Sequence, residues 1–253
     1  MRAITTAARG LVAAVLLAAA GCGQGTASPA PLDPTAAARQ RVIDTANFDC
    51  LDDRGPVVAI TGAEQEMTAA IQVGTGDTAV VLLHQVDGTA CQWYAFALLL
   101  AQRGYRAMAP DITSSDAVEV TQAGIAQLRK DGAKRVIVIG ASRGGTIALA
   151  AAAATTPPVD GVVALSAPTV YGADALTAVA KLDVPTILIA GDLDENFAAH
   201  AKELYGLSIA EHKKLIIRSS VSHGVTLLSG DIEDTVLAFL VDPVATADAP
   251  DPA

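Results

Sequence analysis

Four short apolar runs along the chain predict strands of a parallel sheet. They occupy residues 78–83, 135–139, 161–165 and 186–190, and a further strand is expected over residues 105–109. Strands that are covered by helices on both faces lose the alternation of polar and apolar positions, so they read as continuous apolar runs. Amphipathic or alanine-rich stretches of helical length lie between these runs. The pattern therefore predicts an α/β fold with a mostly parallel central sheet flanked by helices.

The same pattern predicts the remaining elements. Two early strands are expected over residues 56–60 and 68–73, and a last strand over 213–218. In the first long helix, Trp93, Phe96 and Leu100 are spaced to form one apolar face. The predicted helices cover residues 90–103, 119–131, 147–154, 174–182, 196–205 and 231–240.

The first residues have the layout of a secretory signal peptide. Arg2 and Arg9 precede a short apolar run over residues 11–20. That run is too short to cross a bilayer, which requires about 20 apolar residues. The small residues before Cys22 resemble a bacterial lipobox, which implies cleavage after residue 21, acylation of Cys22 and a lipid anchor at the outer face of the membrane. Ordinary cleavage that leaves a free Cys22 is the alternative.

Composition divides the rest of the chain into a linker, a domain and a tail. The small, proline-rich residues after Cys22 predict a flexible linker over residues 22–40. One folded domain is expected over residues 41–242, because this length suits a single large α/β domain. Residues 243–253 are expected to form a disordered tail.

Charge and cysteine content limit the partners. The net charge of −10 argues against nucleic acid and against adsorption to anionic membranes, so membrane contact is expected only through the lipid anchor.

Cys50 and Cys91 remain as a pair, which in an exported protein is expected to form a disulfide, with two buried thiols as the alternative. No cysteine and histidine cluster has zinc spacing, and neither a metal nor a cofactor is expected. The sequence does not determine the oligomeric state.

The strand over residues 135–139 leads into a Gly-x-Ser-x-Gly motif centred on Ser142, and an alanine-rich helix follows. This order is typical of a nucleophile elbow, in which a tight turn lifts the serine hydroxyl above the sheet. Glycine is required at Gly140 and Gly144, because side chains there would collide with the neighbouring strand and helix. Backbone N–H groups at the start of the helix would face a developing oxyanion.

Three further segments, together with the Ser142 motif, resemble a known protein family. Residues 80–84, 99–106 and 109–111, together with the elbow, resemble the core of an α/β-hydrolase, and the resemblance covers residues 56–242. It implies the α/β-hydrolase fold and an oxyanion hole made by the N–H of Arg143 and that of Gln85 or Val86. Gln85 stands where the family has glycine, and its side-chain amide is another candidate donor. Only 16 residues separate Pro168 from Pro185, which leaves no room for a lid domain.

The resemblance also selects the partners of Ser142. The family carries its acid in a turn after the strand over residues 186–190, which selects Asp194 over the nearby Asp192. It carries its histidine in a loop after the last strand, which selects His223. The chain order Ser142, Asp194, His223 is that of an α/β-hydrolase triad.

Other polar residues near strand ends receive structural roles. His84 is expected to orient the neighbouring loop rather than act as a base, and Asp111 to close the loop after its strand. Ser166 also follows a strand, but no elbow glycines surround it. His212 is expected on the surface.

These residues predict a serine hydrolase that cleaves a carboxylic ester through an acyl-enzyme. The substrate would be a small molecule or an ester of the cell envelope. Thioesterase, lactonase and acyltransferase activities use the same core and stay open. A lipid-anchored binding protein on a hydrolase fold is the alternative from another class. A peptidase would normally carry a gating domain, for which the chain has no room.

Overall fold

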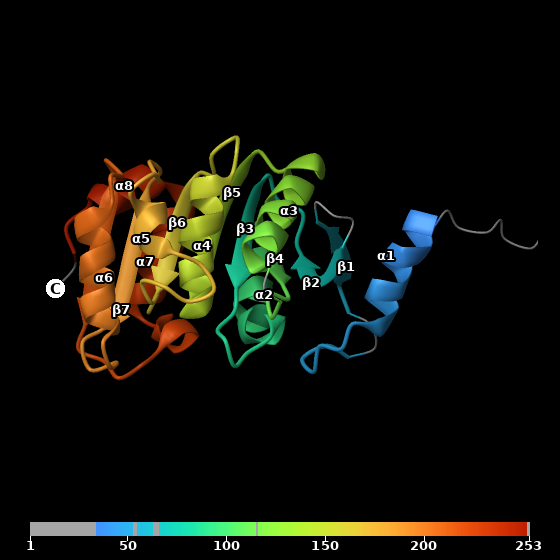
Figure 1. Ribbon diagram of the computed structural model, residues 1–253, viewed down its shortest axis with the longest axis horizontal. Helices are drawn as coiled ribbons and strands as arrows, with labels where there is room; N and C mark the ends of the chain where they lie inside the picture. Colours follow the sequence, from blue (N-terminus) through green and yellow to red (C-terminus); the bar gives the residue numbers. More distant parts are fainter. Residues whose placement is uncertain (1–33, 53–54, 63–65, 115, 252–253) are drawn as a thin grey trace, which may run out of the picture. The chain divides into compact units, whose positions relative to one another are not determined.

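A computed structural model describes residues 34–52, 55–62, 66–114 and 116–251. Eight strands form one sheet in the order β1-β2-β4-β3-β5-β6-β7-β8 (Figure 1). Their bounds are β1 Val57–Thr61, β2 Met67–Val73, β3 Thr78–Leu83, β4 Arg106–Pro110, β5 Arg135–Ala141, β6 Gly161–Leu165, β7 Thr186–Gly191 and β8 Lys213–Arg218.

The sheet is parallel from β4 to β8 and antiparallel at its other edge. Strands β4, β3, β5, β6, β7 and β8 pair with their neighbours in parallel. Strands β1 and β2 pair antiparallel, and β2 pairs antiparallel with β4. The predicted α/β architecture with a mostly parallel sheet is confirmed.

Helices cover both faces of this sheet. Their bounds are α1 Pro34–Thr45, α2 Tyr94–Gln102, α3 Ala117–Lys130, α4 Arg143–Ala154, α5 Ala175–Val179, α6 Phe197–Leu207, α7 Asp231–Val241 and α8 Pro243–Asp248. Two short 3-10 helices, η1 Ala90–Trp93 and η2 Gly224–Leu227, precede α2 and follow β8. The helix expected over residues 90–103 is therefore η1 followed directly by α2.

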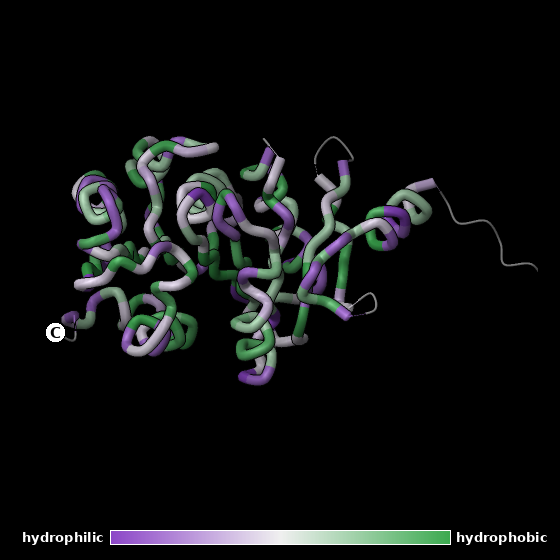
Figure 2. Tube along the Cα trace, turned by 90° about the horizontal axis from the view of Figure 1, so that it is seen from below, coloured by the Kyte–Doolittle hydropathy of each residue, from purple (hydrophilic) through white to green (hydrophobic). Residues whose placement is uncertain are grey.

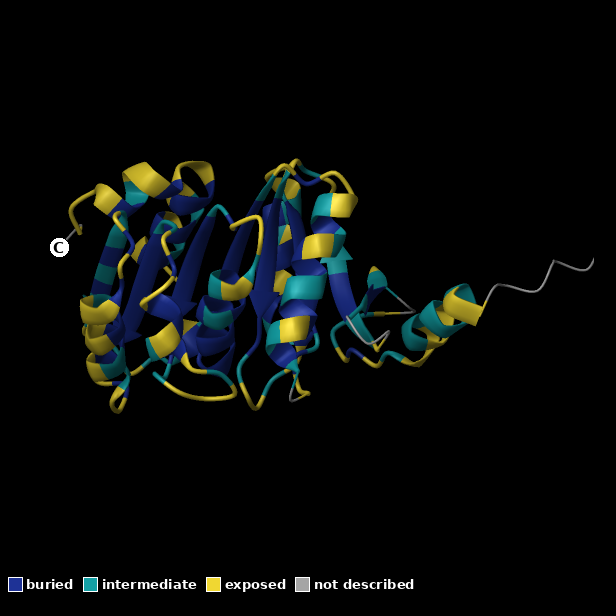
Figure 3. Ribbon diagram, turned by 45° about the horizontal axis from the view of Figure 1, so that its top comes forward, coloured by how far each residue is buried: buried dark blue, intermediate teal, exposed yellow. Residues whose placement is uncertain are grey.

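The sheet separates two apolar cores. Helices α3, α4, α5 and α6 pack on one face, and η1, α2 and α7 on the other. Successive strand residues alternate between them: Val81 and Leu83 join the first core, whereas Val80 and Leu82 join the second. Strands β3 to β7 are buried along almost their whole length, whereas β1, β2 and β8 toward the two edges are only partly buried (Figure 3). Hydrophobic residues predominate along the chain trace through the sheet (Figure 2).

The domain extends further at both ends than the sequence indicated. Helix α1 begins at Pro34, inside the linker predicted over residues 22–40, so the folded part starts earlier than residue 41. The Arg39 guanidinium donates to Ala59 O at 2.7 Å and to Thr61 Oγ1 at 3.0 Å, which fixes α1 to β1. Helix α1 buries no residue, so its sequence did not need the apolar stripe from which a helix is predicted.

The segment predicted as a disordered tail over residues 243–253 instead begins with helix α8. The side chains of β8 and its preceding turn hold it by polar contacts. Arg218 Nη2 lies 2.7 Å from Asp251 Oδ1, and His212 Nδ1 lies 2.9 Å from Asp248 Oδ2. Ala247 is buried among the residues of α7 and the sheet.

Cys50 and Cys91 form a disulfide with a Cα–Cα distance of 5.5 Å. It joins the segment after α1 to η1 across a sequence separation of 41 residues. A loop of that size contributes roughly 3 to 4 kcal/mol by restricting the unfolded chain. Cys22 and the predicted signal peptide lie outside the described residues. Among the helices of the described part, none is both long and apolar enough to cross a membrane.

Candidate active site

The residues singled out in the sequence lie at the carboxyl ends of strands that are neighbours in the sheet. Strands β3, β5, β6, β7 and β8 are adjacent in that order. The loops after them carry, respectively, Val86, Ser142, Ser166, Asp194 and His223. Because parallel strands end at the same edge, residues far apart in sequence meet there.

Ser142 occupies a strained turn between β5 and α4. Its φ of 51° and ψ of −123° lie outside the regions that ordinary residues prefer. A Cβ at Gly140 would lie 2.1 Å from Gly144 O, and a Cβ at Gly144 would lie 2.3 Å from Leu83 O. Both glycines are therefore required for the close approach of strand, turn and helix, as the sequence indicated. The Ser142 N–H donates to Leu165 O at 2.7 Å, which ties the turn to β6.

Asp194 and His223 form a hydrogen-bonded pair. His223 Nδ1 lies 2.8 Å from Asp194 Oδ2 and 3.1 Å from Oδ1. Asp194 is buried, whereas the His223 side chain is 30% exposed. The Phe197 ring packs on the imidazole with centroids 4.4 Å apart. A histidine that donates from Nδ1 to a carboxylate keeps Nε2 available as a proton acceptor.

Asp192 lies outside this arrangement. It is exposed, and its Oδ1 accepts from the Ser220 N–H at 3.3 Å. That contact supports the turn, in line with the choice of Asp194 as the acid.

Ser142 and His223 line the same cleft, but no hydrogen bond joins their side chains within the described part of the chain. Hydrogen bonds of this kind are often long in the absence of substrate and shorten in the complex. The three predicted residues therefore lie around one cleft. Of the two hydrogen bonds expected among them, the structure contains the one between His223 and Asp194.

Ser166 has a role that sequence reasoning missed. It is fully buried, has a φ of 46°, and donates from Oγ to Asp194 Oδ2 at 2.9 Å. Its Oγ in turn accepts from the Gly224 N–H at 3.1 Å. Ser166 thus connects the acid to the residue that follows the histidine.

Two further contacts fix the loop that carries His223. Thr226 Oγ1 accepts from the His223 N–H at 3.0 Å and donates to its carbonyl at 2.9 Å. Gln85 Oε1 accepts from the Val225 N–H at 2.9 Å. At Gly224, with a φ of +57°, a Cβ would lie only 2.5 Å from Gln85 Oε1, so the turn requires glycine.

The same contacts narrow the choice of oxyanion donors. The Gln85 N–H donates to Gln92 Oε1 at 3.0 Å, and the Gln85 side chain is held toward Val225. Val86, which lines the cleft, is the remaining backbone donor after β3. Arg143 is the first residue of α4, so its N–H lacks an intrahelical acceptor and is the second candidate.

The Arg143 side chain takes no part in the candidate oxyanion site. Its guanidinium is buried and donates to Ile112 O and, at 2.9 Å, to Ser114 O. It therefore anchors the loop after β4 to the start of α4.

His84 and Asp111 have the structural positions expected of them. His84 Nε2 accepts from the Ile112 N–H at 3.0 Å, and Nδ1 lies 2.7 Å from Gln85 O. Asp111 Oδ1 accepts from the Thr113 N–H at 3.0 Å within its own loop. His84 thus joins the loops after β3 and β4.

The cleft over Ser142 has a volume of about 420 Å³ and an apolar wall. Between β6 and β7 the only helix is the short α5, so this region carries no lid. No group of acidic, cysteine and histidine side chains suited to a metal occurs among the described residues. The cleft is lined by Val86, Ser142, Pro168, Tyr171, Asp194, Glu195, Phe197 and His223.

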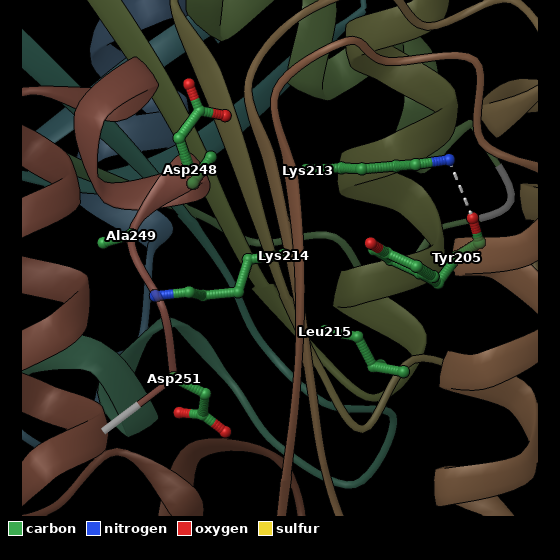
Figure 4. Close-up of a pocket in the computed structure, with 8 residues that line it drawn as sticks. Tyr205, Lys213, Lys214, Leu215, Asp248, Ala249 and Asp251 are labelled. Carbon is green, nitrogen blue, oxygen red and sulfur yellow. Dashed lines mark hydrogen bonds between the residues drawn. The ribbon is translucent and has the colours of Figure 1, made fainter. Parts of the chain in front are cut away.

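A larger cleft of about 570 Å³ lies along β8 (Figure 4). Lys213 and Lys214 extend to opposite sides of the strand, and Lys213 Nζ donates to Tyr205 O at 3.1 Å. None of the predicted catalytic residues lines it. Lysines on an edge strand discourage pairing with another chain, and together with Asp248 and Asp251 they make this groove polar.

Comparisons with known proteins agree with this architecture. A sequence model described as "Alpha/beta hydrolase family" matches residues 80–251. A search of curated proteins by sequence finds no match.

Solved structures with similar folds include several hydrolases. A dienelactone hydrolase from Anabaena variabilis is 19% identical with a TM-score of 0.58, over 73% of this chain and 94% of that one. An esterase from Pyrococcus furiosus is 17% identical with a TM-score of 0.60, over 75% and 90%. A monoacylglycerol lipase from Paleococcus ferrophilus is 15% identical with a TM-score of 0.57, over 71% and 99%. At these identities the likeness concerns the fold.

Proposed function

The chain belongs to the alpha/beta hydrolase family, and from this premise we propose that it hydrolyses a carboxylic ester through an acyl-enzyme on Ser142. Ser142 attacks the carbonyl carbon while His223 Nε2 accepts its proton and then delivers it to the leaving alcohol. Asp194 holds the imidazole and stabilises its charged form. Water then attacks the acyl-enzyme while His223 Nε2 accepts its proton; the bond to Ser142 Oγ breaks, the proton passes to Oγ, and the carboxylic acid is released.

The oxyanion of each tetrahedral intermediate would accept hydrogen bonds from the N–H groups of Arg143 and Val86. Loss of one such donor typically costs roughly 2.7 to 4 kcal/mol of transition-state stabilisation. Gln92 supports this arrangement, because its side chain occupies the Gln85 N–H and so fixes the loop that carries Val86.

The observation that carries the proposal is the 2.8 Å contact between His223 and Asp194 in the cleft that holds the elbow serine. Backbone strain of the kind seen at Ser142 gathers at functional sites, and here it lies in the same cleft as a histidine paired with a buried carboxylate.

Labelling with a fluorophosphonate tests the proposal directly. The wild-type protein should form an adduct whose mass locates to Ser142, and Ser142→Ala should form none while remaining folded. Hydrolysis of a series of p-nitrophenyl esters should follow the labelling. A folded wild-type protein that takes no label would refute an activated serine and favour a binding protein on the same fold.

Three related reactions use the same groups. Thioester and lactone hydrolysis need the same nucleophile and oxyanion donors, and parallel assays with matched thioester and lactone substrates would rank them. The open cleft favours water over a second bound substrate as the acyl acceptor, which supports hydrolysis over acyl transfer.

We also propose that the protein is exported and attached to the outer face of the bacterial membrane through Cys22. The signal-like first residues and the small residues before Cys22 support this. In fractionated cells, the wild type should sediment with membranes and Cys22→Ala should not. Equal release of both would refute the anchor.

A further inference from the structure

The charge of the cleft indicates which esters it accepts, provided that the proposed ester hydrolysis is correct. Beyond the three reacting residues, its lining consists of Val86, Pro168, Tyr171, Phe197 and Glu195. Glu195 is therefore the one additional charged group that a bound substrate meets among the lining residues.

Glu195 carries an uncompensated negative charge. Its side chain is exposed, and no ion pair of the described residues includes it. It lies directly after Asp194, in a backbone conformation with a φ of 43°. Such a conformation is costly for a residue other than glycine, and residues of this kind gather at sites of function.

Among the described residues that line the cleft, none is a lysine or an arginine that could balance this charge. Arg143 is nearest in sequence to the nucleophile, but its guanidinium is buried and bound to Ile112 O and Ser114 O. A carboxylate on a substrate would therefore meet Glu195 and find no partner.

Two aromatic side chains line the cleft with Glu195. Tyr171 is 46% exposed, and Phe197 is half-buried beside His223. Aromatic faces attract ammonium groups through their quadrupole. The net charge of −10 adds a long-range field of the same sign, which draws cations toward the protein and repels anions.

The geometry points to a specificity for esters that carry an ammonium group, with neutral esters accepted and carboxylate-bearing esters disfavoured, and to Glu195 as the residue that sets this order. An exposed ion pair and an exposed cation–π contact are each worth about threefold in binding. The cationic ester should therefore react about tenfold faster than a neutral ester of the same shape, and the anionic ester about threefold slower.

Three p-nitrophenyl esters of similar length test this order. The acyl groups are 4-(trimethylammonio)butanoate, its neutral isostere 5,5-dimethylhexanoate, and glutarate as the anionic monoester. The leaving group is common to all three, and each kcat/KM is divided by the rate of alkaline hydrolysis of that ester to remove its intrinsic reactivity.

The variant Glu195→Gln keeps the shape of the side chain and removes its charge. It should reduce the cationic-to-anionic ratio of kcat/KM by about tenfold, because one attraction and one repulsion disappear together. Glu203→Gln is the matched control: Glu203 is exposed on α6 and does not line the cleft, so the same change in net charge should leave the ratio within about twofold.

The outcomes separate this inference from the proposed function. Two results would overturn the role of Glu195 and leave ester hydrolysis intact, provided that the neutral ester is hydrolysed. One is a wild-type preference for the glutarate ester. The other is an equal loss of charge preference in Glu195→Gln and Glu203→Gln. Hydrolysis of none of the three esters, together with no fluorophosphonate adduct, would refute the proposed function and this inference with it.

Discussion

The hydroxyl of Ser166 gives the sharpest test of how the site is held together. Its Oγ donates to Asp194 Oδ2 at 2.9 Å and accepts from the Gly224 N–H at 3.1 Å, and the residue is fully buried. Ser166→Ala removes one donor from the carboxylate and leaves a buried N–H without a partner. A water molecule restores the contacts of a lost hydroxyl only where the buried site has room for it.

The size of the effect follows from these two contacts. A hydrogen bond to a charged group contributes about 1.5 to 3 kcal/mol, so loss of fixed geometry at Asp194 should lower kcat by about 10- to 100-fold. KM should change little, because Ser166 does not line the cleft. The orphaned N–H should lower the free energy of unfolding by about 2 kcal/mol, or roughly 4 to 8 °C in Tm for a domain of this size.

Ester hydrolysis, thermal unfolding and proton NMR together check this prediction. The downfield resonance of the His223 Nδ1 proton should shift or broaden in Ser166→Ala, an effect that a general loss of stability does not produce. Ser166→Gly relieves the positive φ while also removing the hydroxyl, and it should be as slow as Ser166→Ala. Ser229→Ala makes the same chemical change at an exposed position and should match the wild type.

A Ser166→Ala variant with kcat within about twofold of the wild type and an unchanged Nδ1 resonance would refute this reasoning. Asp194 would then be positioned by its own turn and by His223 alone.

Three other outcomes follow from the structure. Asp194→Asn should abolish most ester hydrolysis, whereas Asp192→Asn should retain most of it; the reverse result in steady-state assays would assign the acid to Asp192. Gly224→Ala would place a methyl group 2.5 Å from the carboxamide oxygen that holds its loop, so it should lower both kcat and Tm, and an unchanged Tm would contradict this. The hydrogen bond to Asp248 raises the pKa of His212 above its ordinary 6.5, so this pair stabilises the fold below that pH and the contribution disappears as pH rises through the raised pKa. Urea unfolding should therefore show His212→Asn less stable than the wild type at pH 5.5 and equal to it at pH 9, and a gap that persists at pH 9 would refute the assignment.

Burial on both faces made most of the sheet predictable from sequence. The uninterrupted apolar runs marked β3, β5, β6 and β7, and glycines at fixed offsets marked the elbow around Ser142. Asp194 and His223 were selected by their places after strands, which is where side chains from different strands converge.

The residues that sequence reasoning missed depend on strand order and on side-chain direction. Ser166 reaches Asp194 because β6 and β7 are neighbours, with Leu165 paired to Ile189. A serine at the end of the strand beside the acid's strand is the signal that would find it, once that order is known. The direction of the Gln85 amide, toward Val225 rather than the cleft, has no counterpart in the local sequence.

The ends of the domain were misjudged for a related reason. Helix α1 buries no residue and helix α8 is only 6 residues long, so their sequences resemble linkers. Arg39, Arg218 and His212 hold them by polar contacts with distant residues, and such contacts leave no periodic pattern.

The Cys50–Cys91 bond also has a mechanical meaning. A pulling force that reaches Cys50 along the chain would pass through the disulfide directly to η1 and α2, which pack against the centre of the sheet. Strands β1 and β2 lie in the loop that the bond closes, so they would carry little of the load. An antiparallel edge that would otherwise peel away one hydrogen bond at a time is thereby shielded from tension, and reduction of the bond would return it to the path of the force.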